Sequence, residues 1–338
     1  MNRGRLFNVM PITLTLADMK ISVRLVLMVV GISWLILHEG WGPLSQGWQM
    51  GLFLIGILTL GVPHGAADLL VEMRNRQAVA FPLLSFLARY LARLALFAGV
   101  LFFFPTLGLG IFILIAAFHF GETDLSALDA QGFTGKLAIL LHGLSILGII
   151  LLGHGDALKP YLALAGSGRM ELSAAMGWLH AYGFWAMIFI CLAAFMAMAV
   201  HCIRHPVEWN KAGRQWALFY LPMAIILWRL PLLEGFTFYF ISWHSVLSLD
   251  CIVGYLCRSG AFSRRKVIAQ IGIFSAIAFL GILAVGLAGF MFASSTTMAW
   301  YVFMGLAVLT APHMEVMHHM YHRLRSSTPS PAGGLVRG

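Results

Sequence analysis

Residues 49–70 read QMGLFLIGILTLGVPHGAADLL, and this stretch decides the class of fold. It is long and apolar enough for a helix to cross a bilayer, which takes roughly 20 mostly apolar residues. Near its end stand His64 and Asp68. Ionisable side chains within membrane spans are costly, and they persist mainly where they face a protein interior and carry function. The stretch therefore predicts a membrane helix with a functional histidine.

The same apolar character extends along the whole chain. Of its 338 residues 60% are hydrophobic and only 10% are charged, whereas a soluble domain carries about 25% charged residues. We therefore expect an all-α, polytopic membrane protein of about ten transmembrane helices. The expected spans are 21–38, 49–70, 83–104, 107–125, 136–153, 177–201, 214–230, 235–257, 267–292 and 297–320.

The basic residues indicate how these spans are oriented. The net charge is +9, and with a cytoplasmic N-terminus only Lys159, Arg169 and Arg229 of the 22 Lys and Arg residues fall on the outer side. So strong a bias predicts an even number of spans with both termini in the cytoplasm. No basic patch is interleaved with aromatic residues, which argues against nucleic-acid binding.

This topology divides the chain into three predicted parts. Residues 1–20 form a cytoplasmic N-terminal segment, residues 21–322 form the transmembrane domain, and residues 323–338 form a disordered tail rich in Ser, Pro and Gly. The four cysteines form no CxxC pair and lie within or beside apolar spans, so we expect buried, reduced thiols.

Three further histidines lie inside apolar spans at similar predicted depths. They occur in the runs FHFGETD at 118–124, ISWHSVLSLD at 241–250 and TAPHME at 310–315. Neutral imidazole is the commonest metal ligand among side chains. Four histidines from four helices therefore predict one buried metal site, and the lack of anionic ligands suits non-haem Fe(II) more than hydrolytic zinc. Its predicted ligands are His64, His119, His244 and His313.

Other polar residues are placed to support these ligands. Asp68 shares a helical face with His64 and can accept its second imidazole N–H. Glu122 follows His119 by one turn, and His142 is a further ligand or a supporting residue. Structural alternatives exist for each motif: a kinked helix held by a His–Asp pair, a helix end facing water at 118–124, and a core histidine satisfied by its neighbours.

The motifs resemble a known family. The runs PHGAAD at 63–68, FHFGETD at 118–124, Trp-His-Ser at 243–245 and Thr-x-Pro-His at 310–313 are similar to those of the Brp/Blh family. Its members are bacterial and archaeal membrane β-carotene 15,15′-dioxygenases. The resemblance covers about residues 50 to 320. It implies a multi-pass protein of the bacterial inner membrane, with non-haem Fe(II) held by histidines, that cleaves β-carotene with O₂ into two retinals.

The resemblance places His64, His119 and His244 on the catalytic iron ligands of that family. The family pattern has another ligand histidine four residues after the third of these, where this chain has Ser248. The fourth ligand is then His313 or His142, or the iron keeps three histidines and an open position, or this member has lost cleavage.

Two other functions fit the residues. The first is a carotenoid- or retinal-binding membrane protein without catalysis, which Ser248 favours. The second is a transporter or proton relay that uses intramembrane His and Asp residues. Inverted repeats would support a transporter, and none is evident in the sequence.

Overall fold

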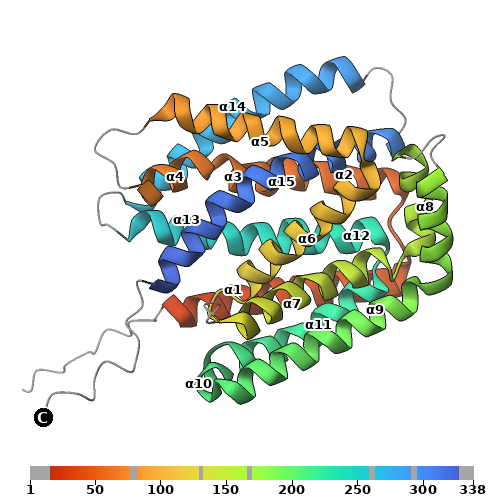
Figure 1. The fold of residues 1–338 in the computed structure, drawn as a ribbon, viewed down its shortest axis with the longest axis horizontal. Helices are drawn as coiled ribbons and strands as arrows, with labels where there is room; N and C mark the ends of the chain where they lie inside the picture. The colour runs from red at the N-terminus through yellow and green to blue at the C-terminus, as the bar shows by residue number, and fades with distance from the viewer. Residues whose placement is uncertain are drawn as a thin grey trace, which may run out of the picture.

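The structure is a computed structural model that describes residues 16–76, 82–128, 132–165, 170–258, 263–290 and 295–326. Every regular element in these ranges is a helix, as predicted (Figure 1). The elements are α1 (Leu16–Trp41), α2 (Gln46–Gly56), η1 (Ile57–Gly61), α3 (Val62–Ala66), α4 (Asp68–Arg76), α5 (Leu83–Phe103), α6 (Pro105–Asp124), α7 (Phe133–Leu151), α8 (Gly155–Ala165), α9 (Met170–Arg204), α10 (Pro206–Glu208), η2 (Trp209–Gly213), α11 (Arg214–Arg229), α12 (Leu232–Phe236), η3 (Thr237–Ser245), α13 (Val246–Cys257), α14 (Arg264–Phe290) and α15 (Ser295–Ser326), where η marks a π-helix.

Within the described residues, seven helices are long and apolar enough to cross a membrane. Three more helices cover the remaining predicted spans: α11, α14 and α15. α15 ends at Ser326, so most of the predicted tail, like most of the predicted N-terminal segment, lies outside the described residues. The seven spans are Ile21–Trp41, Gln46–Arg76, Leu83–Phe103, Pro105–Asp124, Phe133–Leu151, Met176–Arg204 and Leu232–Cys257.

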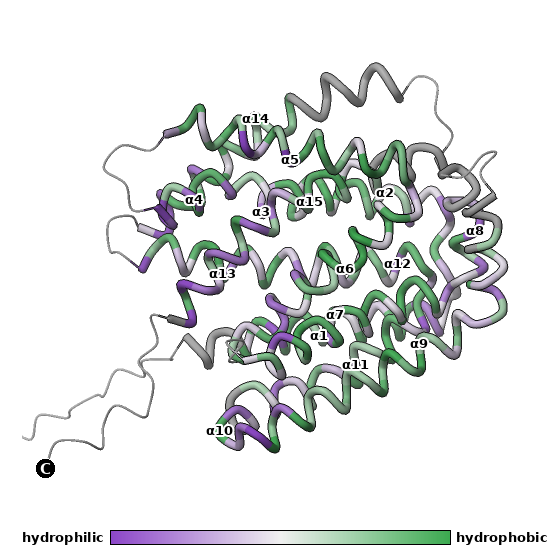
Figure 2. Tube along the Cα trace, in the orientation of Figure 1, coloured by the Kyte–Doolittle hydropathy of each residue, from purple (hydrophilic) through white to green (hydrophobic). Residues whose placement is uncertain are grey.

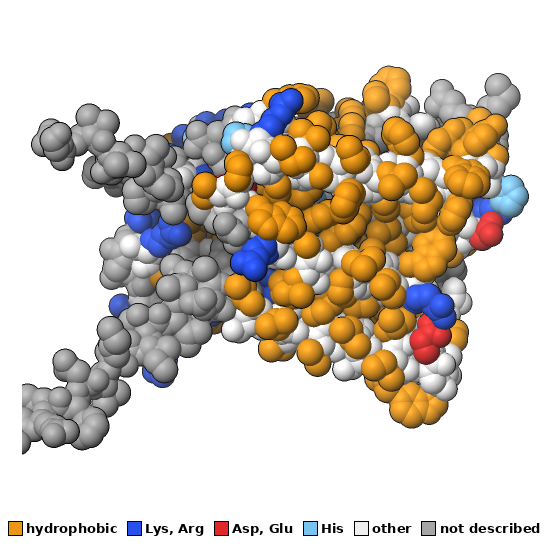
Figure 3. Space-filling model, turned by 90° about the horizontal axis from the view of Figure 1, so that it is seen from below, with side chains coloured by type: hydrophobic (Ala, Val, Ile, Leu, Met, Phe, Trp, Pro, Cys, Tyr) orange, Lys and Arg blue, Asp and Glu red, His pale blue; other side chains and the backbone are white. Residues whose placement is uncertain are grey.

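The surface of the bundle is apolar over most of the helix length. Figure 3 shows hydrophobic side chains covering the middle of one face, with Lys and Arg gathered toward one end, and Figure 2 shows hydrophilic residues mainly near the helix ends. Large apolar side chains such as Leu84, Phe189 and Leu221 are exposed. In water such a surface would cause aggregation, so it is the surface expected of a protein embedded in lipid.

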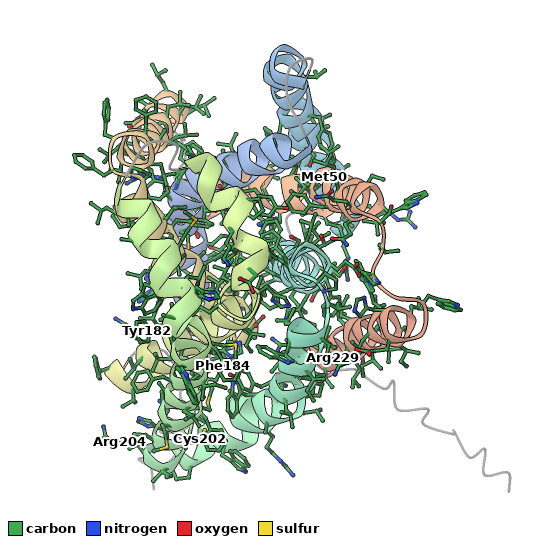
Figure 4. All side chains as sticks on the ribbon, turned by 90° about the vertical axis from the view of Figure 1, so that its right-hand side faces the viewer. Met50, Tyr182, Phe184, Cys202, Arg204 and Arg229 are labelled. Atoms are coloured by element: carbon green, nitrogen blue, oxygen red, sulfur yellow. The ribbon has the colours of Figure 1, made fainter. Side chains whose placement is uncertain are left out.

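The interior combines apolar packing with breaks in the helices. Side chains fill the space between the helices when the bundle is viewed from its end (Figure 4). The π-helix η1 ends just before Pro63, whose missing N–H interrupts the α-helical ladder. The longer π-helix η3 lies within the span Leu232–Cys257. π-Helical turns are frequent at functional sites, and both segments lead directly into predicted site residues.

Glycines let α6 and α7 meet backbone to backbone. A Cβ atom added to Gly121 of α6 would overlap the carbonyl oxygen of Ile139, and one added to Gly143 of α7 would overlap that of Ala117. Small residues permit this close approach in membrane helices. The glycine of the FHFGETD run thus has a packing role, and it sets the position of the α6 segment that carries His119.

Candidate metal centre

The structure brings four of the predicted histidines into one cluster. His64 follows Pro63 on α3, His119 lies in the last turns of α6, His244 lies in η3, and His313 follows Pro312 inside α15. All four are buried, with exposed fractions of 0–6%. Because the four segments come from distant parts of the chain, only the tertiary fold creates this cluster.

Each of the four imidazole rings contacts two of the others. The ring centre of His119 lies 4.8 Å from that of His244 and 5.0 Å from that of His313. The ring centre of His64 lies 5.6 Å from that of His244 and 5.0 Å from that of His313. One nitrogen from each of His64, His119 and His244 lies within 4.8 Å of the other two. The three rings therefore converge on a common point.

The nitrogens at this point have no hydrogen-bond partner. Both ring nitrogens of His119 and His244, Nδ1 of His64 and Nε2 of His313 are buried and unpaired. A buried polar atom without a partner costs about 1–3 kcal/mol, and several such atoms in one place form an expensive arrangement. A metal ion would take up one unpaired nitrogen from each histidine that binds it. Imidazole donors suit iron, zinc, copper and nickel, so the residues fit a first-row transition metal.

Asp68 supports the cluster through a different histidine from the one predicted. Its Oδ1 accepts a hydrogen bond from Nδ1 of His313 at 2.6 Å, and its Oδ2 accepts one from the Tyr90 hydroxyl at 3.0 Å. α3 ends at Ala66 and α4 begins at Asp68, so the predicted shared face with His64 is interrupted. The bond to Asp68 holds the His313 ring through Nδ1 and leaves Nε2 unpaired, as carboxylates do for metal-bound histidines.

Glu122 is hydrogen-bonded to α15 instead of to the predicted partner. Its Oε1 accepts hydrogen bonds from Nδ1 of His318 at 3.0 Å and from Arg325 at 3.2 Å, both on α15. Glu122, Thr123 and Asp124 are all buried, so the end of α6 does not face water. Glu122 links α6 to α15, and the structure gives it no contact with His119.

His142 is held by hydrogen bonds to residues outside the cluster. Nε2 of His142 contacts Asp124 at 2.9 Å, and Nδ1 accepts the Trp216 indole N–H at 3.2 Å, so both of its ring nitrogens are engaged. Ser248 is fully buried one helical turn after His244. Of the two histidines considered for the missing ligand, only His313 combines an unpaired ring nitrogen with ring contacts to the cluster.

Sequence reasoning missed three residues that organise this region. Arg24, assigned to the cytoplasmic helix ends by its charge, is buried and donates to the backbone oxygen of Asp124. Tyr90 supports Asp68. Asp124 gathers several donors at the end of α6. The only signal for Asp124 was its place at the end of the FHFGETD run.

The fold and the site together define a polytopic helical protein of membrane type with a buried polyhistidine centre. A family model described as beta-carotene 15,15′-dioxygenase matches residues 55–321, a range that includes all four clustered histidines. The chain belongs to this family. No curated protein and no solved structure gives a significant match.

Proposed function

We propose that the chain is a non-haem iron oxygenase that cleaves β-carotene, or a related carotenoid, at its central 15,15′ double bond with O₂ to give retinal. The observation that carries this proposal is the convergence of three buried imidazoles, His64, His119 and His244, at the family motifs, with the unpaired Nε2 of His313 in the same cluster. A cluster at a single point favours a metal centre over a proton relay, which would need titratable groups spread along a path.

His64, His119 and His244 would hold the iron, and His313 would be the fourth ligand. The first three converge within 4.8 Å, and Asp68 fixes the ring orientation of His313. When bound, iron supplies the oxidative chemistry with O₂, while the protein contributes binding, orientation and a dry environment.

Aromatic side chains keep water from one side of the histidines. The Phe120 ring centre lies 4.5 Å from that of His244. Phe240 stacks on His244 with ring centres 5.9 Å apart, and Phe236 stacks on Phe240 at 5.4 Å. An apolar wall of this kind suits a hydrocarbon polyene, because it makes no demand for polar partners and offers ring faces for stacking.

We also propose a topology of ten spans in the bacterial inner membrane, with both termini in the cytoplasm. Seven described helices meet the length and hydropathy needed for a span. The helices α11, α14 and α15 supply the other three. The transmembrane domain then corresponds to residues 21–322, and the excess of basic residues at one end supports the orientation.

Co-expression with a β-carotene pathway, followed by retinal analysis and iron measurement on the purified protein, tests the function. We expect retinal and one iron per chain. His64→Ala, His119→Ala and His244→Ala each remove both, while His180→Ala, whose side chain is 71% exposed on α9, removes neither. If all three cluster variants keep full iron and retinal formation, the assignment of the site is wrong.

A carotenoid-binding protein without cleavage is the second candidate, and Ser248 favours it. This residue replaces the further histidine of the family pattern and is fully buried, so it leaves that position without an imidazole. Iron-loaded protein that retains a carotenoid but yields no retinal would support this candidate. Retinal formation would refute it.

A further inference from the structure

Asp124 gathers donors from three other helical segments, two of them at its carboxylate and one at its backbone oxygen. Its Oδ1 accepts the indole N–H of Trp243 at 2.9 Å, and its Oδ2 accepts the hydroxyl of Tyr239 at 3.0 Å. His142 of α7 contacts the same Oδ2 at 2.9 Å. Arg24 of α1 donates to the Asp124 backbone oxygen at 2.6 Å. A residue at the end of α6 thus links α1, α7 and η3.

The hydrogen-bond pattern shows that Asp124 acts as an ionised acceptor. Trp216 donates to Nδ1 of His142, so the His142 proton is on Nε2 and points at Asp124. Every group facing the carboxylate is then a donor. Hydrogen bonds to a buried charged group are stronger than neutral ones. The cavity beside these residues has a volume of about 20 Å³, enough space for about one water molecule and too little for a carotenoid.

The donors to Asp124 adjoin the predicted iron ligands. Trp243 directly precedes His244 in η3, and Asp124 lies five residues after His119 in α6. A π-helix is rare and occurs mostly as a single turn inside an α-helix. The nine-residue η3 therefore needs contacts from outside to fix its rotation, and the bonds from Tyr239 and Trp243 to Asp124 supply them.

We propose that Asp124 is a positioning residue for the metal centre: its carboxylate fixes η3 against α6 and so sets the spacing of His244 and His119. This inference rests on the proposed function, because it concerns the geometry of histidines that would hold iron. It assigns a role to the last residue of the FHFGETD run that does not require contact with iron or carotenoid.

The chain offers a matched control for this carboxylate. Glu234 of α12 is also buried, and its Oε2 accepts the indole N–H of Trp34 at 2.9 Å. Its Oε1 accepts the backbone N–H of Leu44 at 3.0 Å. Asp124→Asn and Glu234→Gln each neutralise one buried acid. Trp243→Phe and Trp34→Phe each remove one indole donor and keep an aromatic ring.

The test measures the Fe²⁺ dissociation constant of the purified full-length protein by chelator competition, together with the visible spectrum of the Co²⁺-loaded form. We expect Asp124→Asn and Trp243→Phe to weaken Fe²⁺ binding about 10–100-fold, the usual loss when a ligand-orienting partner is removed. The visible spectrum of the Co²⁺-loaded form also changes in both variants. Glu234→Gln and Trp34→Phe keep the wild-type constant and spectrum, even where they lower thermal stability equally.

If the Asp124→Asn and Trp243→Phe proteins fold and bind Fe²⁺ with the wild-type dissociation constant, Asp124 has no positioning role. The proposed function is left intact by that result. Trp243→Phe is the milder change and keeps the test valid if Asp124→Asn does not fold. If the wild-type chain binds no iron, the proposed function is overturned, and amide hydrogen exchange of Thr237–Ser245 in the metal-free protein decides the positioning role. Faster exchange in Trp243→Phe than in Trp34→Phe supports it, and equal exchange overturns it.

Discussion

Replacing Gly121 by alanine tests whether the contact between α6 and α7 holds His119 in place. The added Cβ would overlap the carbonyl oxygen of Ile139 and lie 2.8 Å from its carbonyl carbon. Non-bonded carbons prefer about 3.5–4.0 Å, so the two backbones have to separate by about 1 Å. Over-packing of this kind costs about 1–3 kcal/mol. The strain falls two residues from His119.

Gly110→Ala, in the same helix, is the matched control, since a Cβ there meets nothing within 4 Å. Both variants gain the same helix propensity, roughly 1 kcal/mol. The difference in their free energies of unfolding therefore measures the cost of the steric overlap at Gly121. We expect Gly121→Ala to be less stable than Gly110→Ala by about 1–3 kcal/mol of unfolding free energy, measured by SDS titration in mixed micelles.

Because a 1 Å misplacement at a reacting centre costs about 100-fold in rate, retinal formation falls by a similar factor in Gly121→Ala alone. Equal stability and equal retinal formation in the two variants would refute the account of the α6–α7 contact.

Four further predictions concern the metal centre and the topology. His313→Ala lowers iron affinity about 10–100-fold, measured by chelator competition, and an unchanged affinity would show that three histidines suffice. Ser248→His raises iron occupancy or retinal yield, since it restores the imidazole of the family pattern; a silent variant would argue against any need for a further ligand. Asp68→Asn weakens iron binding more than Tyr90→Phe, because Asp68 contacts His313 directly, and the reverse order would contradict the proposed orientation. A thiol label at Lys159→Cys reacts from the periplasm while tags at both termini stay shielded, and an accessible C-terminal tag would rule out an even number of spans.

The helical membrane architecture was predictable because it follows from local properties. Hydropathy and helix length act within each span, and the distribution of basic residues is read loop by loop. Each predicted span overlaps one helix or a run of consecutive helical segments among the described residues. The breaks were harder to predict: Pro63 indicated one of them, but nothing in the residues of η3 distinguishes a nine-residue π-helix from an ordinary turn of α-helix.

The partners of the polar residues were not predictable from spacing. Asp68 lies four residues from His64, yet it pairs with His313, which is 245 residues away. Glu122 lies one turn from His119 and pairs with residues of α15. The spacing of residues along a helix predicts which side chains share a face. It does not predict which other helix packs against that face.

The sequence by itself determined that this is a helical chain of membrane character, that four histidines stand in apolar surroundings, and that the motifs are those of a carotenoid-cleaving family. These conclusions depend on residue type and on positions within single segments. Only the tertiary structure decided that His313 has a free nitrogen in the cluster while His142 has none, and that Asp124 gathers the donors beside it. The physical reason is that a buried polar atom takes its partner from whichever segment lies beside it, and the packing of the whole bundle decides which segment that is.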